Sequence, residues 1–323
     1  MTAELLSDRR RPTRRRRSGA RWAAAGLVLV IAAGLGGAWV WLRGSLVGVP
    51  LREHCLATTS SSIADLEPEQ AGNAALITAV AVRRRLPARA ATIALATAMQ
   101  ESKLYNLDYG DRDSVGLFQQ RPSQGWGTRE QVLDPVHATN AFYDALVKID
   151  GYQTMEITKA AQLVQRSAYP AAYAEHEPAA RALASALSGN SPAALTCVLN
   201  PPAKPGLQAV AAGGLTARAA AVVTAATAQT GQKGVAAPAD ASATPAVGTR
   251  VQFITRGTDS TRAAWALAQW AVAQAANLTV VTVSVDGKQW RRADVDAGWQ
   301  PSTGVADVTA GSATVIVEVA AGS

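Results

Sequence analysis

The sequence predicts a multi-domain protein with an N-terminal transmembrane helix, an all-α domain and a small α/β C-terminal domain. Three observations lead to this fold class. Residues 22–42 carry no charge, helical patterns dominate from residue 68 to residue 187, and strand and helix patterns alternate from Thr249 onward. The 323 residues have a hydrophobic content of 48%, which is enough apolar material for one or two packed cores.

Residues 1–21 are predicted to form a basic cytoplasmic tail. They hold eight arginines against Glu4 and Asp8, which places +6 of the chain's net charge of +7 in this segment. The remaining residues are therefore nearly neutral, and the basicity belongs to the tail and not to a binding face. For this reason we expect no nucleic-acid partner.

Residues 22–42 are predicted to be the transmembrane helix. A helix of this length spans about 30 Å, the thickness of the hydrocarbon core of a bilayer. Trp22, Trp39 and Trp41 lie near its ends, where indoles favour the membrane interface, and the preceding arginines favour a cytoplasmic N-terminus. We therefore expect a single-pass cell-membrane protein with extracytoplasmic C-terminal domains. A cleavable secretory signal is the alternative interpretation, and it too exports the rest of the chain.

The two cysteines, Cys55 and Cys197, lie near the ends of the predicted all-α domain, residues 50–199. In an exported protein such a pair is most simply one disulfide that closes the domain. The sequence contains no CxxC, HExxH, GxSxG or P-loop motif, and no GxGxxG with a following acidic residue. We therefore expect neither a metal nor a cofactor.

Five helices are predicted in this domain, at residues 68–84, 87–102, from 134 onward, about 158–168 and 177–187. Pro87 and Pro135 each suit a first helical turn, and Asp134 is a suitable N-cap. Residues 103–133 are rich in Gly, Asp, Ser and Pro, which indicates a loop. A loop of this length inside a compact domain is usually functional.

Residues 200–213 are predicted to be a linker, and residues 214–323 a second domain that includes a flexible stretch at 230–248. Residues 215–229 have the composition of a helix. The later segments "RVQFI", "LTVVTVSVDG" and "SATVIVEVA" are predicted strands, and a helix follows Asp259 as its N-cap.

Glu101 is the candidate catalytic residue. Ile93, Ala94 and Thr97 precede it by 8, 7 and 4 positions and share its helical face. A carboxyl group on an apolar face is partly shielded from water, which favours its protonated form, and such a group is a candidate general acid. The alternative is a glutamate that ends a helix and points to solvent.

Two neighbouring segments, "ESKLYN" and "SVGLFQQ", resemble the lysozyme-like lytic transglycosylase and goose-type lysozyme superfamily. In that family a Glu-Ser pair ends a core helix and a Gly-Leu-Met-Gln segment follows. Glu101 and Ser102 match the first element, and Gly116, Leu117, Phe118 and Gln119 match the second, with Phe118 in place of methionine. The family's later Ala-Tyr-Asn element is matched only in part, by residues 168–170. The resemblance covers about residues 70–190.

This resemblance implies a peptidoglycan lytic transglycosylase that cleaves MurNAc-β-1,4-GlcNAc bonds with a single glutamate, Glu101, as acid and then base. Glycan strands of peptidoglycan are the implied substrate. The implied substrate-binding residues are Ser102, Gly116, Leu117, Phe118, Gln119 and Tyr169. Ser102 has two alternative roles, orienting Glu101 or binding the N-acetyl group, beside the simpler one of ending the helix. Three aromatic residues either line the cleft or pack in the core, and the sequence favours neither role; they are Tyr169, Tyr173 and Trp126.

Two alternatives to this function stay open. Asp113 is a possible second carboxylate that positions water, which makes the protein a hydrolytic muramidase; a turn-forming, solvated aspartate is the other interpretation. The second alternative is a non-catalytic cell-wall-binding or scaffold protein of an envelope secretion or transfer machine. The sequence indicates no particular protein partner.

Residues 214–320 resemble an actinobacterial cell-wall module related to zinc D-Ala-D-Ala peptidases, through a helix with two tryptophans and a "DG-x2-W" turn. The positions of the family's metal ligands carry Thr244, Gln252 and Thr314 instead, so the resemblance implies a copy without zinc. The tryptophans are expected to be core residues in preference to a row of sugar-stacking rings; they are Trp265, Trp270, Trp290 and Trp299.

Overall fold

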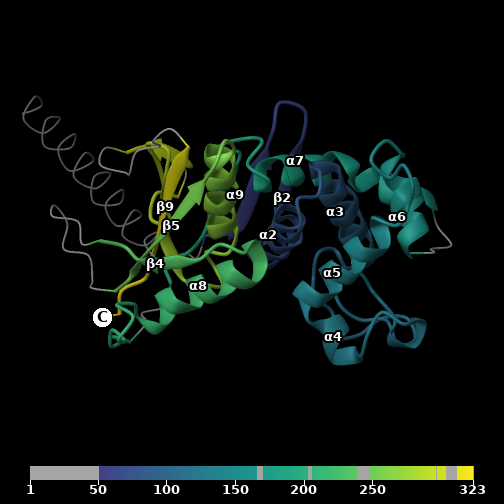
Figure 1. Ribbon diagram of the computed structural model, residues 1–323, viewed down its shortest axis with the longest axis horizontal. Coiled ribbons are helices and arrows are strands. Elements are labelled where there is room, and N and C mark those ends of the chain that lie inside the picture. Colours follow the sequence, from purple (N-terminus) through teal and green to yellow (C-terminus); the bar gives the residue numbers. More distant parts are fainter. Residues whose placement is uncertain are drawn as a thin grey trace, which may run out of the picture. The chain divides into compact units, whose positions relative to one another are not determined.

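The computed structural model describes residues 51–165, 170–202, 206–238, 248–295, 297–302 and 311–322, and Leu51–Ser323 form one compact unit (Figure 1). The predicted basic tail, residues 1–21, and the predicted transmembrane helix, residues 22–42, lie outside the described residues. Among the helices that are described, none is both long enough and apolar enough to cross a membrane.

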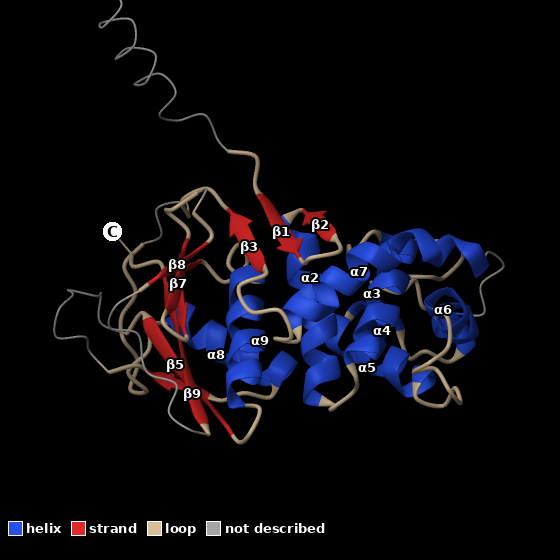
Figure 2. Ribbon diagram, turned by 90° about the horizontal axis from the view of Figure 1, so that it is seen from above, coloured by secondary structure: helices blue, strands red, loops and turns tan. Residues whose placement is uncertain are grey.

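The predicted all-α class of the first domain is wrong, because this domain contains a three-stranded antiparallel sheet (Figure 2). Its strands, in the order β2-β1-β3, are β1 (His54–Thr58), β2 (Ile63–Leu66) and β3 (Leu195–Val198). Cys55, Ala57, Ala64 and Leu66 are buried and alternate with more exposed neighbours, as in half-buried strands. Runs of four or five residues are too short for a strand pattern to be recognised in the sequence.

The predicted disulfide between Cys55 and Cys197 is confirmed. The two residues lie opposite each other on β1 and β3, with Cα atoms 4.0 Å apart and a sequence separation of 142. Both are buried. Closing a loop of this length removes unfolded-state entropy worth about 4–5 kcal/mol in the chain-entropy model. The bond therefore fixes the first strand of the domain to its last.

Helices form the rest of the first domain: α2 (Pro68–Arg83), α3 (Ala88–Ser102), α4 (Arg129–Leu133), α5 (Pro135–Leu146), α6 (Ile157–Gln165) and α7 (Glu177–Leu187). Two 3-10 turns, η1 (Pro122–Gln124) and η2 (Pro170–His176), complete the set. Helix α3 packs against α2, α5, α6 and α7. Its residues are buried on nearly all sides, and six of its fifteen residues are alanines, so that its neighbours approach closely. Helix α4 and η1 lie inside the predicted loop.

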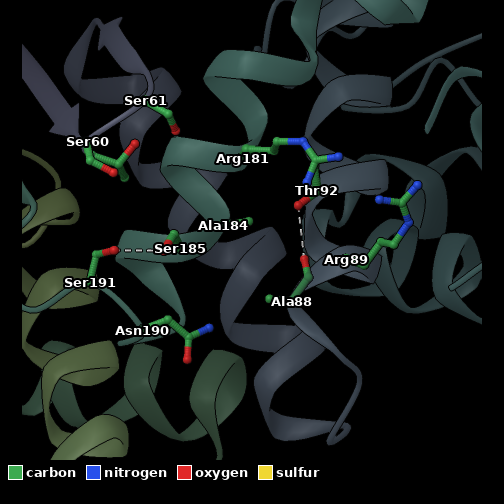
Figure 3. A pocket seen from close by; sticks show the side chains of 11 residues that line it. Ser60, Ser61, Ala88, Arg89, Thr92, Arg181, Ala184, Ser185, Asn190 and Ser191 are labelled. Carbon is green, nitrogen blue, oxygen red and sulfur yellow. Dashed lines mark hydrogen bonds between the residues drawn. The ribbon is translucent and has the colours of Figure 1, made fainter. Parts of the chain in front are cut away.

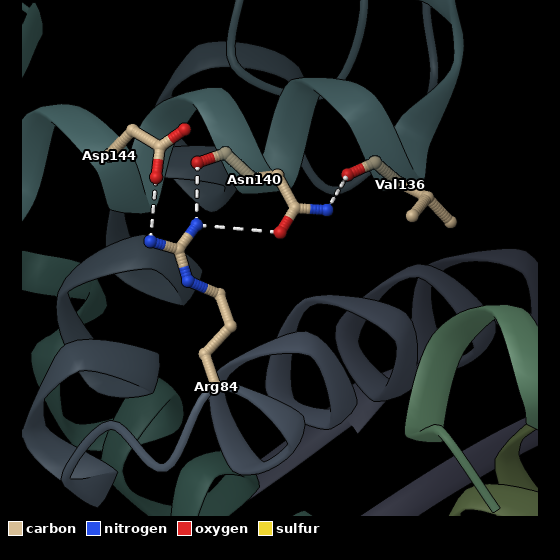
Figure 4. Close-up of polar contacts among 4 residues, drawn as sticks. All are labelled: Arg84, Val136, Asn140 and Asp144. Carbon is tan, nitrogen blue, oxygen red and sulfur yellow. Dashed lines mark hydrogen bonds and ion pairs between the residues drawn. The ribbon is translucent and has the colours of Figure 1, made fainter.

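Arg84, at the end of α2, holds α5 in place (Figure 4). Its Nη1 donates a hydrogen bond of 2.9 Å to the carbonyl oxygen of Asn140, and its Nη2 donates one of 2.6 Å to Asp144 Oδ1. The guanidinium also lies 5.8 Å from the ring centroid of Tyr143. The Arg84 side chain is 22% exposed and Asp144 is 62% exposed, so water screens the ion pair, whereas the bond to Asn140 is partly buried.

The C-terminal part contains a six-stranded antiparallel sheet with the order β4-β5-β9-β6-β7-β8. Its strands are β4 (Gly234–Ala236), β5 (Arg250–Arg256), β6 (Val280–Val285), β7 (Lys288–Arg291), β8 (Trp299–Pro301) and β9 (Ser312–Val319). Alternate residues are buried, Val251 and Phe253 on β5 and Val315 and Val317 on β9. Strand β4 lies within residues 230–248. The described chain thus combines helices with two antiparallel sheets.

Two helices accompany this sheet, α8 (Ala217–Thr230) and α9 (Ser260–Ala273). Helix α9 contacts β5, β6 and β9 and also α2 and α7, so it lies between the second sheet and the helices of the first domain (Figure 2). The tryptophans expected in the core are confirmed there, all at most 9% exposed: Trp265, Trp270, Trp290 and Trp299.

The two parts are joined at strand β3, whose outer edge is paired with no strand of the described residues. The indole N–H groups of Trp290 and Trp299 donate hydrogen bonds of 3.2 Å and 2.8 Å to the carbonyl oxygens of Cys197 and Leu195. The backbone N–H of Leu195 donates to Gln269 Oε1 at 2.8 Å. Side chains of the C-terminal part therefore satisfy the free edge of the first sheet.

Candidate active site around Glu101

Glu101 lies in the last turn of α3 and is half-buried. Its Oε1 accepts a hydrogen bond of 2.7 Å from the hydroxyl of Tyr173, a residue of η2 whose side chain is almost fully buried. No other side-chain hydrogen bond or ion pair of Glu101 occurs within the described residues. The tyrosine therefore fixes one carboxyl oxygen and leaves Oε2 for a ligand.

The chain turns sharply directly after this glutamate. Lys103 and Leu104 have φ values of 54° and 64°, and the N–H of Leu104 donates to the carbonyl of Ala98 at 3.1 Å, so the helix ends in a left-handed turn. Each left-handed residue that is not glycine costs about 1–2 kcal/mol. Side-chain amides of α2 offset this cost, because Gln70 and Asn73 donate 2.8 Å hydrogen bonds to the carbonyls of Lys103 and Leu104. Helix α2 thus fixes the end of α3.

Ser102 connects the two sequence elements of the site. Its hydroxyl lies 2.7 Å from the carbonyl oxygen of Leu117 and 3.0 Å from that of Ala98. The residue is only 4% exposed. A buried hydroxyl with two carbonyl acceptors has no proton left for another group, so its observed part is to hold the Gly116–Gln119 turn against the end of α3.

The turn itself requires glycine at position 116. Gly116 has a φ of 81°, and a Cβ atom built on it would lie 2.6 Å from the carbonyl oxygen of Val132. Its N–H donates a hydrogen bond of 2.6 Å to the carbonyl of Leu107, and Val115 pairs with Gln120 across the turn. Both the dihedral angle and the close approach of α4 exclude a side chain here.

Leu117 and Phe118 are fully buried. The Phe118 ring stacks on Phe142 of α5, with 4.6 Å between centroids and an interplanar angle of 17°. The carbonyl of Phe118 accepts a hydrogen bond of 2.7 Å from Gln165 Nε2. Both residues are predicted to bind substrate, but their side chains have no exposed surface that a sugar could contact.

Gln119 holds the preceding loop. Its Nε2 lies 3.2 Å from the carbonyl of Tyr109 and 3.3 Å from that of Gly116. A Cβ atom on Gly110 would lie 2.6 Å from the carbonyl oxygen of Ser114 and 1.9 Å from Gln119 Oε1, so the backbone contact disfavours a side chain at this position. Gln119 is half-buried, and its remaining surface is open to a ligand.

Asp113 caps η1. Its Oδ2 accepts a hydrogen bond of 2.7 Å from the N–H of Ser123, and its Oδ1 accepts from Ser123 Oγ at 3.0 Å and from Arg121 Nε at 2.9 Å. The backbone N–H of Ser123, followed by the Arg121 guanidinium, holds the pKa of Asp113 well below its usual range. Asp113 is thus an ionised group with a partner on each oxygen.

The remaining predicted residues differ in what can be said of them. Tyr169 lies outside the described residues. Trp126 is half-buried against the core and also lines a cavity of about 470 Å³, together with Lys148, Ile149 and Gln165. The indole therefore has both a packing contact and a face on open space. Within the described residues, no cluster of three or more His, Cys, Asp or Glu side chains is placed to hold a metal ion.

Sequence reasoning left two features of the site unspecified. The Tyr173 hydroxyl reaches Glu101 across 72 positions, and no spacing rule connects them. Beside it, His176 Nε2 lies 3.0 Å from Gln100 Oε1, and burial lowers the pKa of His176. In the sequence, the only indication of these two contacts is the presence of a tyrosine and a histidine in the segment that follows the predicted cleft residues.

The chain was also compared with known proteins. No protein-family model matches it, and no curated protein is similar to it at a significant level.

Proposed function

We propose that this protein is an exported lytic transglycosylase that cleaves the glycan strands of peptidoglycan with Glu101. The single observation that carries the proposal is the arrangement of this carboxyl group. It is half-buried at the end of a buried helix, one oxygen is fixed by Tyr173, and the other is free among the described groups. The resemblance of the segments around Glu101 and Gly116 to lysozyme-like transglycosylases supports the choice of substrate.

In the first step Glu101 acts as the general acid. Since Oε1 accepts the hydrogen bond of Tyr173, the transferable proton sits on Oε2. This proton passes to the glycosidic oxygen as the bond to C1 of the muramic acid breaks, and the GlcNAc-side alcohol leaves. The carbonyl oxygen of the substrate's own N-acetyl group bonds to C1 and stabilises the positive charge, so a second protein carboxylate is not required.

In the second step Glu101, now a carboxylate, acts as the base. It takes the proton of the C6 hydroxyl of the same sugar, O6 bonds to C1, and the N-acetyl oxygen leaves C1. The product is a 1,6-anhydro end, and Glu101 regains its proton. Asp113 accepts three hydrogen bonds from Ser123 and Arg121, which take most of the about four acceptor positions of a carboxylate. This engagement favours transglycosylation over hydrolysis, because little of the carboxylate is left to position a water molecule.

The proposed compartment is extracytoplasmic. The disulfide between Cys55 and Cys197 is buried within the fold and joins strands β1 and β3. Disulfides of this structural kind form and persist in oxidising compartments. Peptidoglycan is present in such a compartment, so the location and the substrate are consistent with each other.

The test is digestion of purified peptidoglycan with the full chain and with Glu101→Gln, followed by mass spectrometry of the released sugars. Glu156→Gln is the matched control, since Glu156 is an exposed glutamate of the same domain. The wild type and the control should release fragments with 1,6-anhydro ends, and Glu101→Gln should reduce their yield by about 100-fold or more, the range for loss of a general acid.

Two other outcomes correct the proposal in different ways. Reducing ends that disappear in Glu101→Gln would assign hydrolysis and not transglycosylation. Equal background release by the wild type and by Glu101→Gln would reject catalysis by Glu101. In that case, binding of the chain to intact peptidoglycan without cleavage would favour the wall-binding alternative.

A further inference from the structure

Two neighbouring cavities open at the beginning of α3. The first, of about 430 Å³, is bordered by the β1–β2 turn, the first residues of α3 and α7 (Figure 3). The second, of about 520 Å³, lies between the end of α2, α3 and the segment that leads from β5 into α9. Ala88 and Asn190 line both cavities, so the two are adjacent. Glu101 lies at the other end of α3, about 20 Å away along the helix axis.

The walls of these cavities carry a concentrated positive charge. Five arginines face a single acidic residue, Asp259, which gives the combined lining a charge of +4; the arginines are Arg85, Arg89, Arg181, Arg256 and Arg262. Outside its first 21 residues the whole chain has a net charge of only +1. This small region therefore holds an excess of positive charge that the rest of the folded chain does not share.

Two of the arginines have no partner within the described part of the chain. Arg262 pairs with Asp259 at 3.0 Å, and Arg181 pairs with Glu177. Arg85 and Arg256 are exposed, and neither makes an ion pair or a side-chain hydrogen bond with a described residue. Guanidinium groups in this situation are free to bind an anion with two hydrogen bonds each.

Arg89 differs, because it is partly buried. Its Nη2 donates to the carbonyl of Met155, and its Nε is buried with no hydrogen-bond partner. Because this N–H has no acceptor among the described groups, part of the positive charge of Arg89 stays uncompensated beside the cavity. Helix α3 begins here after Pro87, without a side-chain cap or an acidic residue in its first turn, which adds to the positive potential.

The first cavity adds hydroxyl groups to this charge. Its walls contain six serine and threonine side chains and the amide of Asn190; the hydroxyl residues are Thr59, Ser60, Ser61, Thr92, Ser185 and Ser191. Such groups both donate to and accept from the hydroxyls of a sugar or polyol. Among the described residues that line the two cavities none is aromatic, so these residues offer no platform on which a nucleobase could stack.

We propose that the two cavities, the arginine groove, form a binding site for a phosphorylated polyol or glycan chain. The phosphate groups bind the arginines around Ala88, with Arg85 and Arg256 as the principal ligands, and the chain's hydroxyls bind the serines of the first cavity. The site is separate from Glu101 and would anchor the protein to an anionic polymer while the candidate active site works on another strand.

Calorimetric titration of the full chain with a glycerol phosphate oligomer, at several salt concentrations, tests this site. Arg85→Gln/Arg256→Gln should bind the oligomer about tenfold or more weakly, as expected for loss of charge-assisted hydrogen bonds. The slope of log K against log salt should also become shallower by about 1–2, since two phosphate contacts are lost. Because both side chains are exposed and unpaired, the melting temperature of the variant should equal that of the wild type.

The charge-matched control is Arg52→Gln/Arg291→Gln, two exposed arginines outside the groove. It should bind as the wild type does, and Glu101→Gln should as well, which separates this site from the proposed catalytic one. Three results would overturn the proposal: no binding by the wild type, an equal loss in the control variant, or equally tight binding of an oligothymidylate of the same charge.

Discussion

Replacing Gly116 with alanine tests the view that backbone geometry builds the candidate site. The residue has a φ of 81°, and an added Cβ would lie 2.6 Å from the carbonyl oxygen of Val132. The left-handed conformation alone costs an alanine about 1 kcal/mol relative to glycine. The contact with a backbone oxygen adds about 1–3 kcal/mol, because α4 or the turn has to shift. The expected loss of unfolding free energy is therefore about 2–4 kcal/mol.

Gly125→Ala is the matched control for this change. Gly125 has a φ of 84°, but no atom lies within 4 Å of its added Cβ, so only the conformational cost of about 1 kcal/mol applies. Urea unfolding followed by tryptophan fluorescence measures both variants, and thermal melting gives a second estimate. If the two alanine variants lose the same stability, the contact with Val132 has no energetic weight and the reasoning is refuted.

Two further predictions concern neighbouring side chains. Tyr173→Phe removes the hydroxyl that fixes Glu101 Oε1. Because the acid is then misplaced, the kcat of peptidoglycan cleavage should fall by about 10–100-fold, with KM little changed. An unchanged kcat would contradict the positioning role. Asp113 has a pKa lowered from 3.8 in the folded state, first by the Ser123 N–H and then by Arg121, so its contribution to stability is present above about pH 4 and is lost as the pH falls through the lower folded-state pKa. Asp113→Asn should therefore lower the melting temperature near neutral pH, and its difference from the wild type should shrink below about pH 4; a difference that does not change with pH would contradict this assignment.

Several features of this protein could be predicted from sequence because they depend on local patterns. The helix that ends at Ser102 follows from a long run of helix formers, and the disulfide follows from the presence of just two cysteines in the sequence. The burial of the tryptophans in α9 follows from their spacing among apolar residues. In each case neighbouring residues carry enough information.

Other features depend on contacts between distant parts of the chain, and these could not be predicted. Strands β1 and β3 are stabilised by pairing with each other across 142 positions. The short runs of residues that form them do not predict this pairing. Ser102 is an ordinary helix-end serine in sequence, and only the fold shows that its hydroxyl meets the carbonyl of Leu117. Asp113 is likewise a possible second carboxylate or a turn residue in sequence, and only the fold shows its contacts with Ser123 and Arg121.

The cover that the C-terminal part places on strand β3 has a consequence for how the chain is made. The acceptors on β3 are synthesised at residues 195 and 197, whereas their indole donors, Trp290 and Trp299, come about a hundred residues later. Until then the first sheet has an open edge, a surface on which strands of other chains can add. The first domain therefore does not complete its fold before the C-terminal part is synthesised. The edge of its sheet is covered only after residue 299 has been synthesised.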